Sequence, residues 1–355
     1  MAQELLKKES ILVTGGEMFV GYHIVSYLLT QNPNLTISVL DHPSTVPRFP
    51  TVAYYDVDFS SPLAVTTALR SIRPTVIFHA ACTYSLALPA PTFHKVNFQE
   101  TENVLAAAQD IGTVKAFIYH SSTSVTEHGT SSLISATEDL PVLFAPDQEF
   151  PYPLCKALAE KLVLDANGQH GILTCSIRPA AAFGEADTET AEKLIQNARA
   201  GRANTQIGDG RNVYDFLYVG NLAHAHVLAA NALLKGGRGP GGRVDGEAFQ
   251  ITNDEPWLFW DFSRAIAKGV GHEVNKEHIR SIPIWIAWCM AFIAEWWVWV
   301  VSRGQGQSAL TRFGIRYATK NRTIDISKAK RVLGYRPIWS MNQGLERTLK
   351  WYQKE

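Results

Sequence analysis

The stretch of sequence that decides the fold is Thr14-Gly15-Gly16-Glu17-Met18-Phe19-Val20-Gly21, which follows the β-branched run at 11–14. The apolar run predicts a buried strand, the glycines a tight turn, and the spacing of apolar residues over 21–29 a helix. A dinucleotide pyrophosphate rests at such a strand–turn–helix junction, on the helix N-terminus. The G-x-x-G-x-x-G spacing has Met18 in its middle position, so a side chain stands where phosphates would approach. A plain strand–turn–helix unit is the alternative interpretation.

Further strands are predicted at 35–40, 76–78, 116–119 and 173–177, with helical segments between them. This alternation is typical of an α/β protein with a Rossmann-type, doubly wound parallel sheet. After Pro179 the alternation weakens. We therefore predict a dinucleotide-binding domain over 1–182, to which 213–235 return, and a smaller, mostly helical substrate lobe over 183–212 and 244–355.

Asp41 ends the second predicted strand, twenty residues after Gly21. A carboxylate there can bond the adenine-ribose hydroxyls and would repel a 2′-phosphate, which favours NAD over NADP. The alternative is a turn-forming Asp before His42-Pro43. Asp58, followed by Phe59, is a further candidate contact for the adenine.

The motif Tyr152-Pro153-Leu154-Cys155-Lys156 is Y-x-x-x-K, and on a helix its two ends share a face. An ammonium and a cationic nicotinamide would both favour the phenolate of Tyr152, which could then exchange a proton while hydride moves. Upstream, Ser121-Ser122-Thr123-Ser124 ends a predicted strand, where a hydroxyl can hold a substrate oxygen. The alternative for this run is a solvated Ser/Thr turn.

The composition limits the function further. The 355 residues carry 33 basic and 33 acidic side chains, which argues against a nucleic-acid partner. The four cysteines form no CxxC pair, so we expect no metal site and no disulfide framework, and reduced thiols fit a cytoplasmic protein. The first ten residues hold no apolar signal-peptide core.

Residues 282–301 are nearly all apolar and contain five of the nine Trp. Their length approaches that of a membrane-spanning helix, but Pro283, Glu295 and the Trp content fit a bilayer centre poorly. Attachment at a membrane interface and a soluble pocket wall or core helix are the two favoured alternatives. Both favoured interpretations suggest a lipophilic substrate.

The glycine turn, the serine run and the Tyr–Lys pair occur in the order that is typical of one superfamily. The sequence resembles the extended short-chain dehydrogenases/reductases, and within them the 3β-hydroxysteroid dehydrogenase family, near its fungal sterol-4α-carboxylate 3-dehydrogenase (decarboxylating) branch. The resemblance covers nearly the whole chain; the stretches that carry it are 76–81, 96–97, 101–105, 177–179, 207–210, 214–221, 225–230, 246–254, 259–260, 294–296 and 328–335.

The resemblance implies a role for each site residue. Tyr152 would be the catalytic acid/base, Lys156 its electrostatic partner on the nicotinamide ribose, and Ser122 the catalytic hydroxyl that binds the substrate oxygen. Other substrate contacts would be Ser124 and Phe183. The cofactor would meet the following residues: Gly15, Gly16, Met18, Phe19, Val20, Gly21, Asp41, Asp58, Phe59, Ala80, Ala81, Asn97, Tyr152, Lys156 and Pro179. Met18 departs from the family, which has glycine there.

The leading functional hypothesis is an NAD-dependent oxidation of a 3β-hydroxyl on a sterol or triterpenoid, with a 4-carboxysterol and loss of CO2 as the specific case. One alternative is a dehydrogenase or ketoreductase of fungal terpenoid or meroterpenoid metabolism. Another is a non-catalytic nucleotide-binding protein, which the Met18 substitution motivates. The resemblance further implies a homodimer, and the segment 282–301 suggests peripheral attachment to the cytosolic face of the endoplasmic reticulum.

Overall fold

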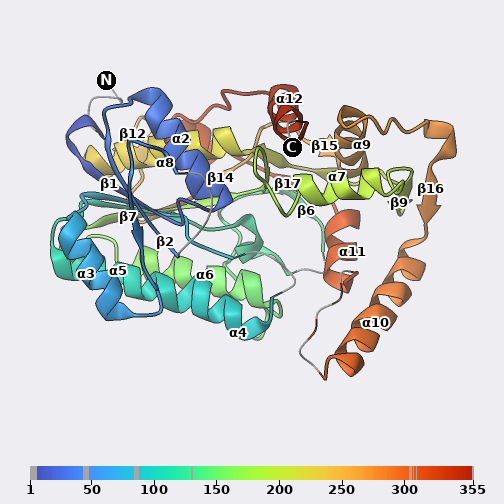
Figure 1. Ribbon diagram of the computed structural model, residues 1–355, viewed down its shortest axis with the longest axis horizontal. Coiled ribbons are helices and arrows are strands. Elements are labelled where there is room, and N and C mark those ends of the chain that lie inside the picture. The colour runs from blue at the N-terminus through green and yellow to red at the C-terminus, as the bar shows by residue number, and fades with distance from the viewer. Residues whose placement is uncertain are drawn as a thin grey trace.

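The centre of the molecule is a parallel sheet in the order β14-β7-β5-β4-β1-β2-β3, seen in a computed structural model (Figure 1). The model describes residues 6–42, 48–83, 88–128, 131–303, 306, 308 and 310–353. The strands are β1 (Ser10–Thr14), β2 (Thr36–Asp41), β3 (Ala53–Asp56), β4 (Val76–His79), β5 (Ala116–His120), β7 (Leu173–Pro179) and β14 (Glu247–Ile251). The order reverses direction between β1 and β4, where ligands bind in doubly wound sheets. The predicted fold class is confirmed.

Helices cover both faces of this sheet, as right-handed crossovers require. On one face lie α2 (Phe19–Gln31) and α8 (Val219–Leu234); on the other lie α3 (Pro62–Ile72), α5 (Glu100–Ile111) and α6 (Pro151–Asp165) (Figure 1). The central strands β4 and β5 are buried over their whole length, because both faces are covered. This layering leaves only the strand ends open to ligands.

Short elements connect the longer helices and strands. They are η1 (Leu6–Lys8), α4 (Ala90–Phe93), the π-helical turn η2 (His94–Gln99), the 3₁₀ turns η3 (Thr123–Thr126) and η4 (Gln169–Gly171), β8 (Ala181–Phe183), β11 (Phe216–Tyr218), β12 (Arg238–Gly239), β13 (Gly242–Arg243) and the π-helical turn η6 (Ala329–Leu333). Strands β8 and β11 pair with each other in parallel.

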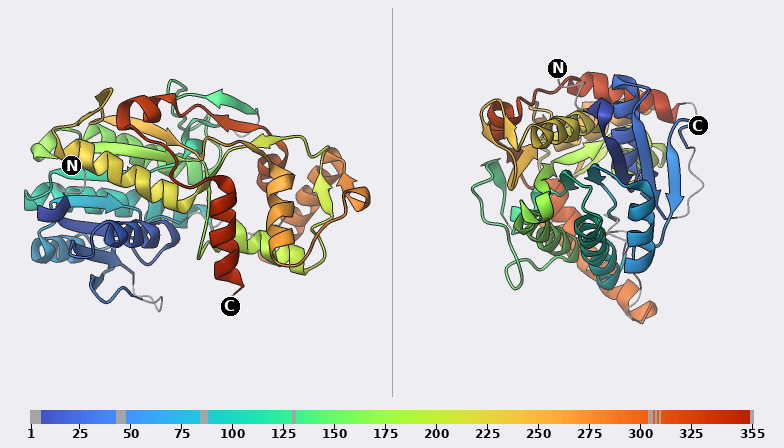
Figure 2. Two further views of the ribbon diagram at one scale, coloured as in Figure 1. Left: turned by 90° about the horizontal axis from the view of Figure 1, so that it is seen from above. Right: turned by 90° about the vertical axis from the view of Figure 1, so that its left-hand side faces the viewer.

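A second lobe lies at one end of the sheet, and helix α12 packs where the two parts meet (Figure 2). Its elements are α7 (Ala191–Arg199), β9 (Thr205–Ile207), β10 (Val213–Tyr214), β15 (Trp257–Leu258), α9 (Phe259–Gly269), η5 (Lys276–His278), β16 (Arg280–Ile282), α10 (Ile284–Val301), α11 (Arg312–Thr319), β17 (Arg322–Ile324) and α12 (Met341–Tyr352). Its four-stranded sheet, in the order β15-β10-β17-β6, includes β6 (Leu133–Ala136) from the first part of the chain.

The division of the chain between the central sheet and the lobe differs from the predicted ranges in two places. Strand β14 lies within 244–355, which we expected in the lobe, yet it pairs with β7 along its whole length and extends the central sheet. Strand β6 lies within 1–182 but pairs with β17 of the lobe. In both cases a partner far away in the sequence decides the placement, so local pattern could not reveal it.

Helix α10 projects from the lobe with most of its surface uncovered (Figure 1). Its 18 residues have a mean hydropathy of 1.7, and 11% of them are buried, which makes it long and apolar enough to cross a membrane by length and composition. Only Ala287 and Ala291 of this helix are buried. The core-helix interpretation is therefore wrong, because a core helix would be covered on all sides.

The turn between β1 and α2 depends on three glycines. A Cβ at Gly15, whose φ is +69°, would lie 2.6 Å from the Cα of Ala81. A Cβ at Gly16 would lie 2.6 Å from Val39, and one at Gly21 would lie 2.1 Å from the carbonyl oxygen of Gly15. At Gly15 and Gly21 two backbone segments lie so close together that a residue with a Cβ atom would not fit.

Gly21→Ala is therefore expected to lower the free energy of unfolding by about 1–3 kcal/mol or more, because the added methyl overpacks rigid backbone. The matched control is Gly112→Ala, where φ is +65° but nothing lies within 4 Å of the added Cβ. The control should cost only the roughly 1–2 kcal/mol of a left-handed alanine. Equal losses in urea unfolding of the two variants would contradict the close approach at Gly21.

Candidate functional site

A cavity of about 700 Å³ opens at the carboxyl ends of the central strands. It reaches from the start of α2 past the ends of β5 and β7 to α6, α7, α11 and β17. Its lining includes Phe19, Val20, Ser122, Ser124, Tyr152 and Pro179, all of which the sequence predicts as site residues. Residues of α10 do not appear among the described residues that line it; Pro283, Ile284, Trp285 and Trp288 instead line a separate cavity with Gly208, Asp209 and Ser281.

The glycine turn presents a helix N-terminus to this edge. Met18 is the residue before the first turn of α2, with φ −89° and ψ 163°, and its N–H donates to the carbonyl oxygen of Gly15 (3.0 Å). This is extended backbone that any residue adopts. Met18 therefore leaves the turn and the open N–H groups of α2 intact.

Asp41 lies at the end of β2, beside the glycine turn. Its buried carboxylate accepts from the N–H of Glu17 (2.8 Å) and from the N–H of His42 (2.8 Å). Burial raises the pKa of Asp41, and the two N–H donors oppose that rise. The carboxylate is thus held at the end of β2, beside the glycine turn.

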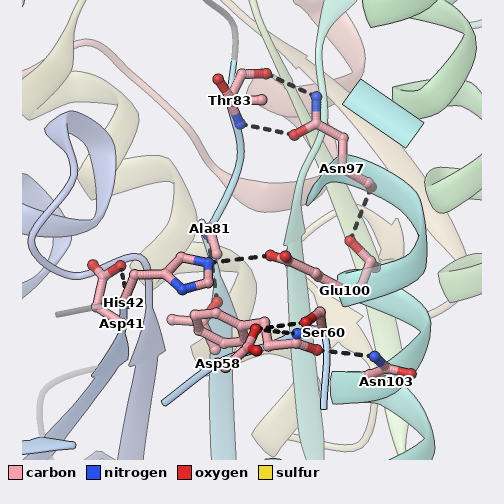
Figure 3. Close-up of polar contacts among 12 residues, drawn as sticks. Asp41, His42, Asp58, Ser60, Ala81, Thr83, Asn97, Glu100 and Asn103 are labelled. Atoms are coloured by element: carbon pink, nitrogen blue, oxygen red, sulfur yellow. Dashed lines mark hydrogen bonds and ion pairs between the residues drawn. The ribbon is translucent and has the colours of Figure 1, made fainter. Parts of the chain in front are cut away.

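The ring of His42 lies between Asp41 and the buried carboxylate of Glu100, as the dashed contact in Figure 3 shows. The His42 Nε2 and Glu100 Oε2 atoms are 3.5 Å apart, and the same ring meets the ring of Phe59 edge-on at 5.2 Å. Phe59 itself is fully buried and packs against the His42 ring. Sequence reasoning missed His42 and Glu100, because no local pattern predicts that α5 passes the end of β2.

Asp58 lies at the surface, near His42 (Figure 3). Its Oδ1 accepts from the N–H (2.9 Å) and the hydroxyl (2.7 Å) of Ser60, and these bonds lower the pKa of Asp58. A charged carboxylate is therefore present where an adenine amino group would approach.

Ala80 and Ala81 follow β4 and are buried directly opposite the glycine turn. Asn97, on the π-helical turn η2, hydrogen-bonds to the backbone just after them (Figure 3). Its Oδ1 accepts from the Thr83 N–H (2.8 Å) and its Nδ2 donates to the Thr83 carbonyl (2.7 Å). Asn97 thus shapes the site through backbone rather than by lining the cavity.

A chain of hydroxyls leads to the phenol of Tyr152. The Ser124 hydroxyl donates to the Ser122 oxygen over 2.8 Å, and the Ser122 hydroxyl hydrogen-bonds to Tyr152. Because Ser122 is held in this direction by the 3₁₀ turn that it caps, its hydroxyl faces the phenol. The structure brings together the three residues that the sequence predicted to act on one substrate oxygen.

Lys156 lies one helical turn from Tyr152 and is almost completely buried. Its ammonium donates to the carbonyl oxygen of His120 and stands 4.4 Å from the centroid of the Tyr119 ring. Burial lowers the pKa of Lys156, and the ammonium in turn contributes to a lowered pKa of His120. The neighbouring imidazoles are therefore neutral, and Lys156 supplies the positive charge.

Burial is also the largest influence on Tyr152 and raises the pKa of its phenol. The hydrogen bond from Ser122 opposes that rise, as does the positive charge of Arg322. Burial thus outweighs both Ser122 and Arg322. Ionisation of Tyr152 then requires additional positive charge in the cavity.

Phe183, predicted as a substrate contact, lies elsewhere. It is fully buried on β8, where its ring meets that of Phe262 at 5.0 Å, while its neighbours Ala181 and Ala182 line the cavity. Contacts of its ring with Phe262 and Tyr218 place Phe183 in the core. A role in binding substrate is not available to it in this structure.

The far wall of the cavity contains residues that sequence reasoning missed. Arg322, Phe313 and Tyr317 line it, from β17 and α11. They lie more than 150 residues from Tyr152, outside every quoted motif. Only the pairing of β17 with β10 and β6 brings them to the site.

Features of the chain at this edge of the sheet fit a nicotinamide dinucleotide. The N-terminus of α2 would hold its phosphates and Asp41 a ribose, and the buried Nδ1 of His120 has no partner among the described residues. Within the described ranges no group of three or more His, Cys, Asp or Glu is suitably placed to hold a metal ion.

Comparison with known proteins places these features in a family. Residues 12–282 match the model of the 3-beta hydroxysteroid dehydrogenase/isomerase family. The chain is 32% identical to sterol-4-alpha-carboxylate 3-dehydrogenase ERG26, decarboxylating, of Candida albicans, covering 98% of each protein. It is 34% identical to sterol-4-alpha-carboxylate 3-dehydrogenase, decarboxylating, of Mus musculus, covering 99% of this chain and 92% of the relative. It is also 35% identical to 3beta-hydroxysteroid-dehydrogenase/decarboxylase isoform 1 of Arabidopsis thaliana, covering 98% and 81%.

Solved structures share the fold at lower identity. UDP-glucose 4-epimerase of Thermotoga maritima has a TM-score of 0.73 at 20% identity, covering 97% of this chain and 98% of its own. The dTDP-glucose 4,6-dehydratase DesIV of Streptomyces venezuelae, solved with NAD, has a TM-score of 0.71 at 23% identity, covering 97% of both chains. These likenesses concern the arrangement of strands and helices.

Proposed function

The chain belongs to the 3-beta hydroxysteroid dehydrogenase/isomerase family, and on this ground we propose that it oxidises the 3β-hydroxyl of a sterol or triterpenoid with a nicotinamide cofactor. A 4-carboxysterol is the proposed substrate, in line with the names of its relatives. The observation that carries the proposal is the hydroxyl chain Ser124–Ser122–Tyr152, which ends in the cavity beside the glycine turn.

The chain's own residues bind the substrate oxygen and move its proton. Ser122 orients the 3-hydroxyl, and Tyr152 accepts its proton. The oxidised nicotinamide, when bound, accepts the hydride and contributes a positive charge. Lys156 adds to that charge from its buried position, so the phenolate becomes accessible only in the loaded site. The resulting ketone oxygen then receives hydrogen bonds from Tyr152 and Ser122.

Decarboxylation follows from the product's own chemistry. A ketone at C3 beside a carboxylate at C4 is a β-keto acid. When the bond from C4 to the carboxylate breaks, its electron pair passes into the C3 ketone as an enolate, and CO2 leaves. The hydrogen bonds from Tyr152 and Ser122 stabilise this oxyanion, and a proton on C4 completes the ketone.

We propose NAD rather than NADP as the cofactor. The Asp41 carboxylate would repel a 2′-phosphate. Arg48, the nearest cation along the chain, is engaged by both Glu17 (2.7 Å) and Asp56. Residues 42–47 contain no Lys or Arg in the sequence, so this stretch offers a phosphate no free cation.

Two alternatives differ in substrate or in catalysis. A dehydrogenase or ketoreductase of terpenoid or meroterpenoid metabolism would use the same Tyr152 and Ser122. The non-catalytic nucleotide-binding protein was motivated by Met18. The ordinary backbone geometry of Met18 means that the turn itself does not require glycine there, so the Met18 side chain is what remains of that motive.

For the assembly we propose a homodimer through α5 and α6, an expectation from the family resemblance that the mass of the protein in light scattering would test. For the location we propose attachment to the cytosolic face of the endoplasmic reticulum through one face of α10. Strand β16 before α10 pairs with β9, and β17 after it pairs with β10, so both ends of the helix return to the same lobe. A helix that spans a membrane once would separate them.

The single charge of α10 supports this orientation. Glu295 accepts from the Arg312 backbone N–H (2.7 Å) and pairs with its guanidinium (2.6 Å), so the acid faces α11 rather than lipid. Trp296, Trp297 and Trp299 remain more than half exposed. Such side chains suit the headgroup region of a membrane.

The first test of the proposed function is turnover. The protein with NAD and a 4α-carboxysterol should yield NADH, CO2 and the decarboxylated 3-ketone, with slower turnover on NADP. Tyr152→Phe should lower kcat by about 10²–10⁴-fold because the proton acceptor is lost, while the binding of NAD in calorimetry persists. Unchanged turnover in this variant would disprove the assigned role, and product formation only from terpenoid ketones would favour the alternative enzyme.

The second test concerns the pH dependence. The pKa of Tyr152 is raised by burial and lowered by the Ser122 bond, so kcat/KM should rise with pH as the phenolate forms. Ser124→Ala removes the donor behind Ser122 and should shift this rise to higher pH, with activity recovering in alkaline buffer. The control is Thr126→Val, because the Thr126 hydroxyl donates to the Thr123 carbonyl (3.2 Å) within the same turn. A parallel shift in both variants would contradict the hydroxyl chain.

The third test concerns membrane attachment. The protein should float with neutral phosphatidylcholine vesicles in a density gradient, at low and at high salt alike, because apolar contact is not screened. Replacing Trp296, Trp297 and Trp299 together by Ser should reduce the floating fraction at least ~10-fold, given the apolar area removed. Leu63→Ser, at the 77% exposed Leu63 of α3, is the control. Equal flotation of the triple variant would exclude α10 as the attachment site.

A further inference from the structure

The lining of the cavity includes a buried imidazole that the mechanism does not use. His120 ends β5, directly before the serine run, and lines the cavity together with Ser122 and Tyr152. It is 6% exposed, and its Nδ1 atom is buried without a hydrogen-bond partner among the described residues. Buried polar groups in folded proteins are normally paired, so this exception requires an explanation.

The other buried histidines of the described chain are held by hydrogen bonds. His79 engages both ring nitrogens, with the Thr14 hydroxyl 2.7 Å from Nδ1 and the Thr101 hydroxyl 2.9 Å from Nε2. His226 donates from Nδ1 to a backbone carbonyl one helical turn earlier (2.9 Å). His120 contacts the His226 ring by stacking, with the two ring centroids 5.4 Å apart. Stacking positions the His120 ring but leaves its hydrogen-bonding capacity unused.

The His120 ring faces away from the catalytic helix. Neighbouring side chains of a strand point to opposite faces of the sheet. The Tyr119 ring accordingly meets the Lys156 ammonium of α6, whereas the His120 ring meets His226 of α8. Helix α2 packs on the same face as α8. The imidazole therefore lines the α2–α8 side of the cavity.

The neighbouring residues on this side are apolar. Phe19 and Val20, at the start of α2, and Pro179, at the end of β7, line the cavity with side chains that form no hydrogen bonds. Proline has no N–H, and the N–H of the residue after it already donates to the carbonyl oxygen of Ile251 (2.9 Å). His120 thus adds hydrogen-bonding capacity to an otherwise apolar part of the lining.

A nicotinamide ring in this cavity would have one face toward the substrate and the other toward this lining. Its reactive carbon must meet the carbon whose oxygen Ser122 and Tyr152 hold. The carboxamide on the ring would then be buried, which is costly without a hydrogen-bond partner. Burial, and the charge of Lys156 nearby, hold the pKa of His120 well below its usual value. The imidazole is therefore neutral and does not repel the cationic ring of the oxidised cofactor.

We propose that His120 binds the carboxamide of the nicotinamide and thereby holds the ring in place behind its reactive carbon. This inference rests on the nicotinamide cofactor of the proposed function, whichever sterol or terpenoid is oxidised. A neutral imidazole and a carboxamide each contain a donor and an acceptor, so the two groups match in either tautomer. The backbone carbonyl of His120 accepts from Lys156, which links this position to the catalytic helix.

The experiment compares ligands with and without the nicotinamide ring: NAD, NADH and ADP-ribose, each titrated into the protein in a calorimeter. His120→Phe keeps a ring against His226 but removes both nitrogens. It should raise the Kd of NAD and of NADH by roughly 3- to 10-fold, as expected for one lost hydrogen bond, and change that of ADP-ribose less than about twofold. His120→Asn, whose amide can hydrogen-bond near the position of Nδ1, should recover part of the affinity.

A matched control is His224→Phe on α8. His224 is half-buried, and its Nδ1 lies 2.8 Å from the hydroxyl oxygen of Tyr27, outside the described lining of the cavity. This variant should leave the Kd of all three ligands unchanged. A loss of NADH affinity as large as that in His120→Phe would overturn the proposal, because it would show a general effect of altering this side of the sheet.

A second variant covers the case in which His120→Phe does not fold. His120→Leu also lacks the nitrogens and is smaller, and the same selective loss is expected. In either folded variant, an equal loss for NADH and ADP-ribose, or no loss, would overturn the proposal, as would wild-type protein that binds NADH no more tightly than ADP-ribose. Wild-type protein that binds NADH tightly but oxidises no sterol would overturn the proposed function alone, because the binding comparison needs no sterol.

Discussion

The close approach of the backbone at Gly15 and Gly21 is the constraint on which the rest of the structure depends. Because neither residue has a Cβ, the first turn of α2 lies against the end of β1, and β1 lies against the chain leaving β4. This contact fixes the point where the strand order reverses. Asp41, Ser122, Tyr152 and Pro179 come from separate segments, yet they meet at one edge because parallel strands end together.

The electrostatics of the site follow from one buried cation. Lys156 is held by a backbone carbonyl and an aromatic ring, neither of which neutralises it. The nearby Glu160 is committed to Arg178 over 2.6 Å. Lys156 also contributes to lowering the pKa of His79 to about 3 and that of His226 to about 4, in each case after burial. An uncompensated charge of this kind favours an anion placed beside it.

The sequence predicted those parts of the molecule that local chemistry determines. The glycine turn, Asp41 at a strand end and the Tyr152–Lys156 spacing depend on a few neighbouring residues, and they lie where expected. Strand β14 was misassigned because a short apolar run fits a lobe and a sheet equally well until its partner is known. Phe183 was misread because only its packing against Phe262, which is distant in the sequence, places it in the core.

The exposure of helix α10 and the position of Arg322 in the cavity wall could not be predicted for a related reason. An apolar helix has the same composition whether it is covered or bare, and only the packing of α11 along one stripe distinguishes the two. Arg322 depends on β17 being inserted between β10 and β6.

Helix α11 lies between α10 and the cavity. Its Arg312 pairs with Glu295 of α10, while its Phe313 and Tyr317 line the cavity. One short helix therefore supports the exposed apolar surface on one side and the substrate wall on the other. Helix α11 thus connects α10 directly to Tyr317, whose ring lies beside Arg322.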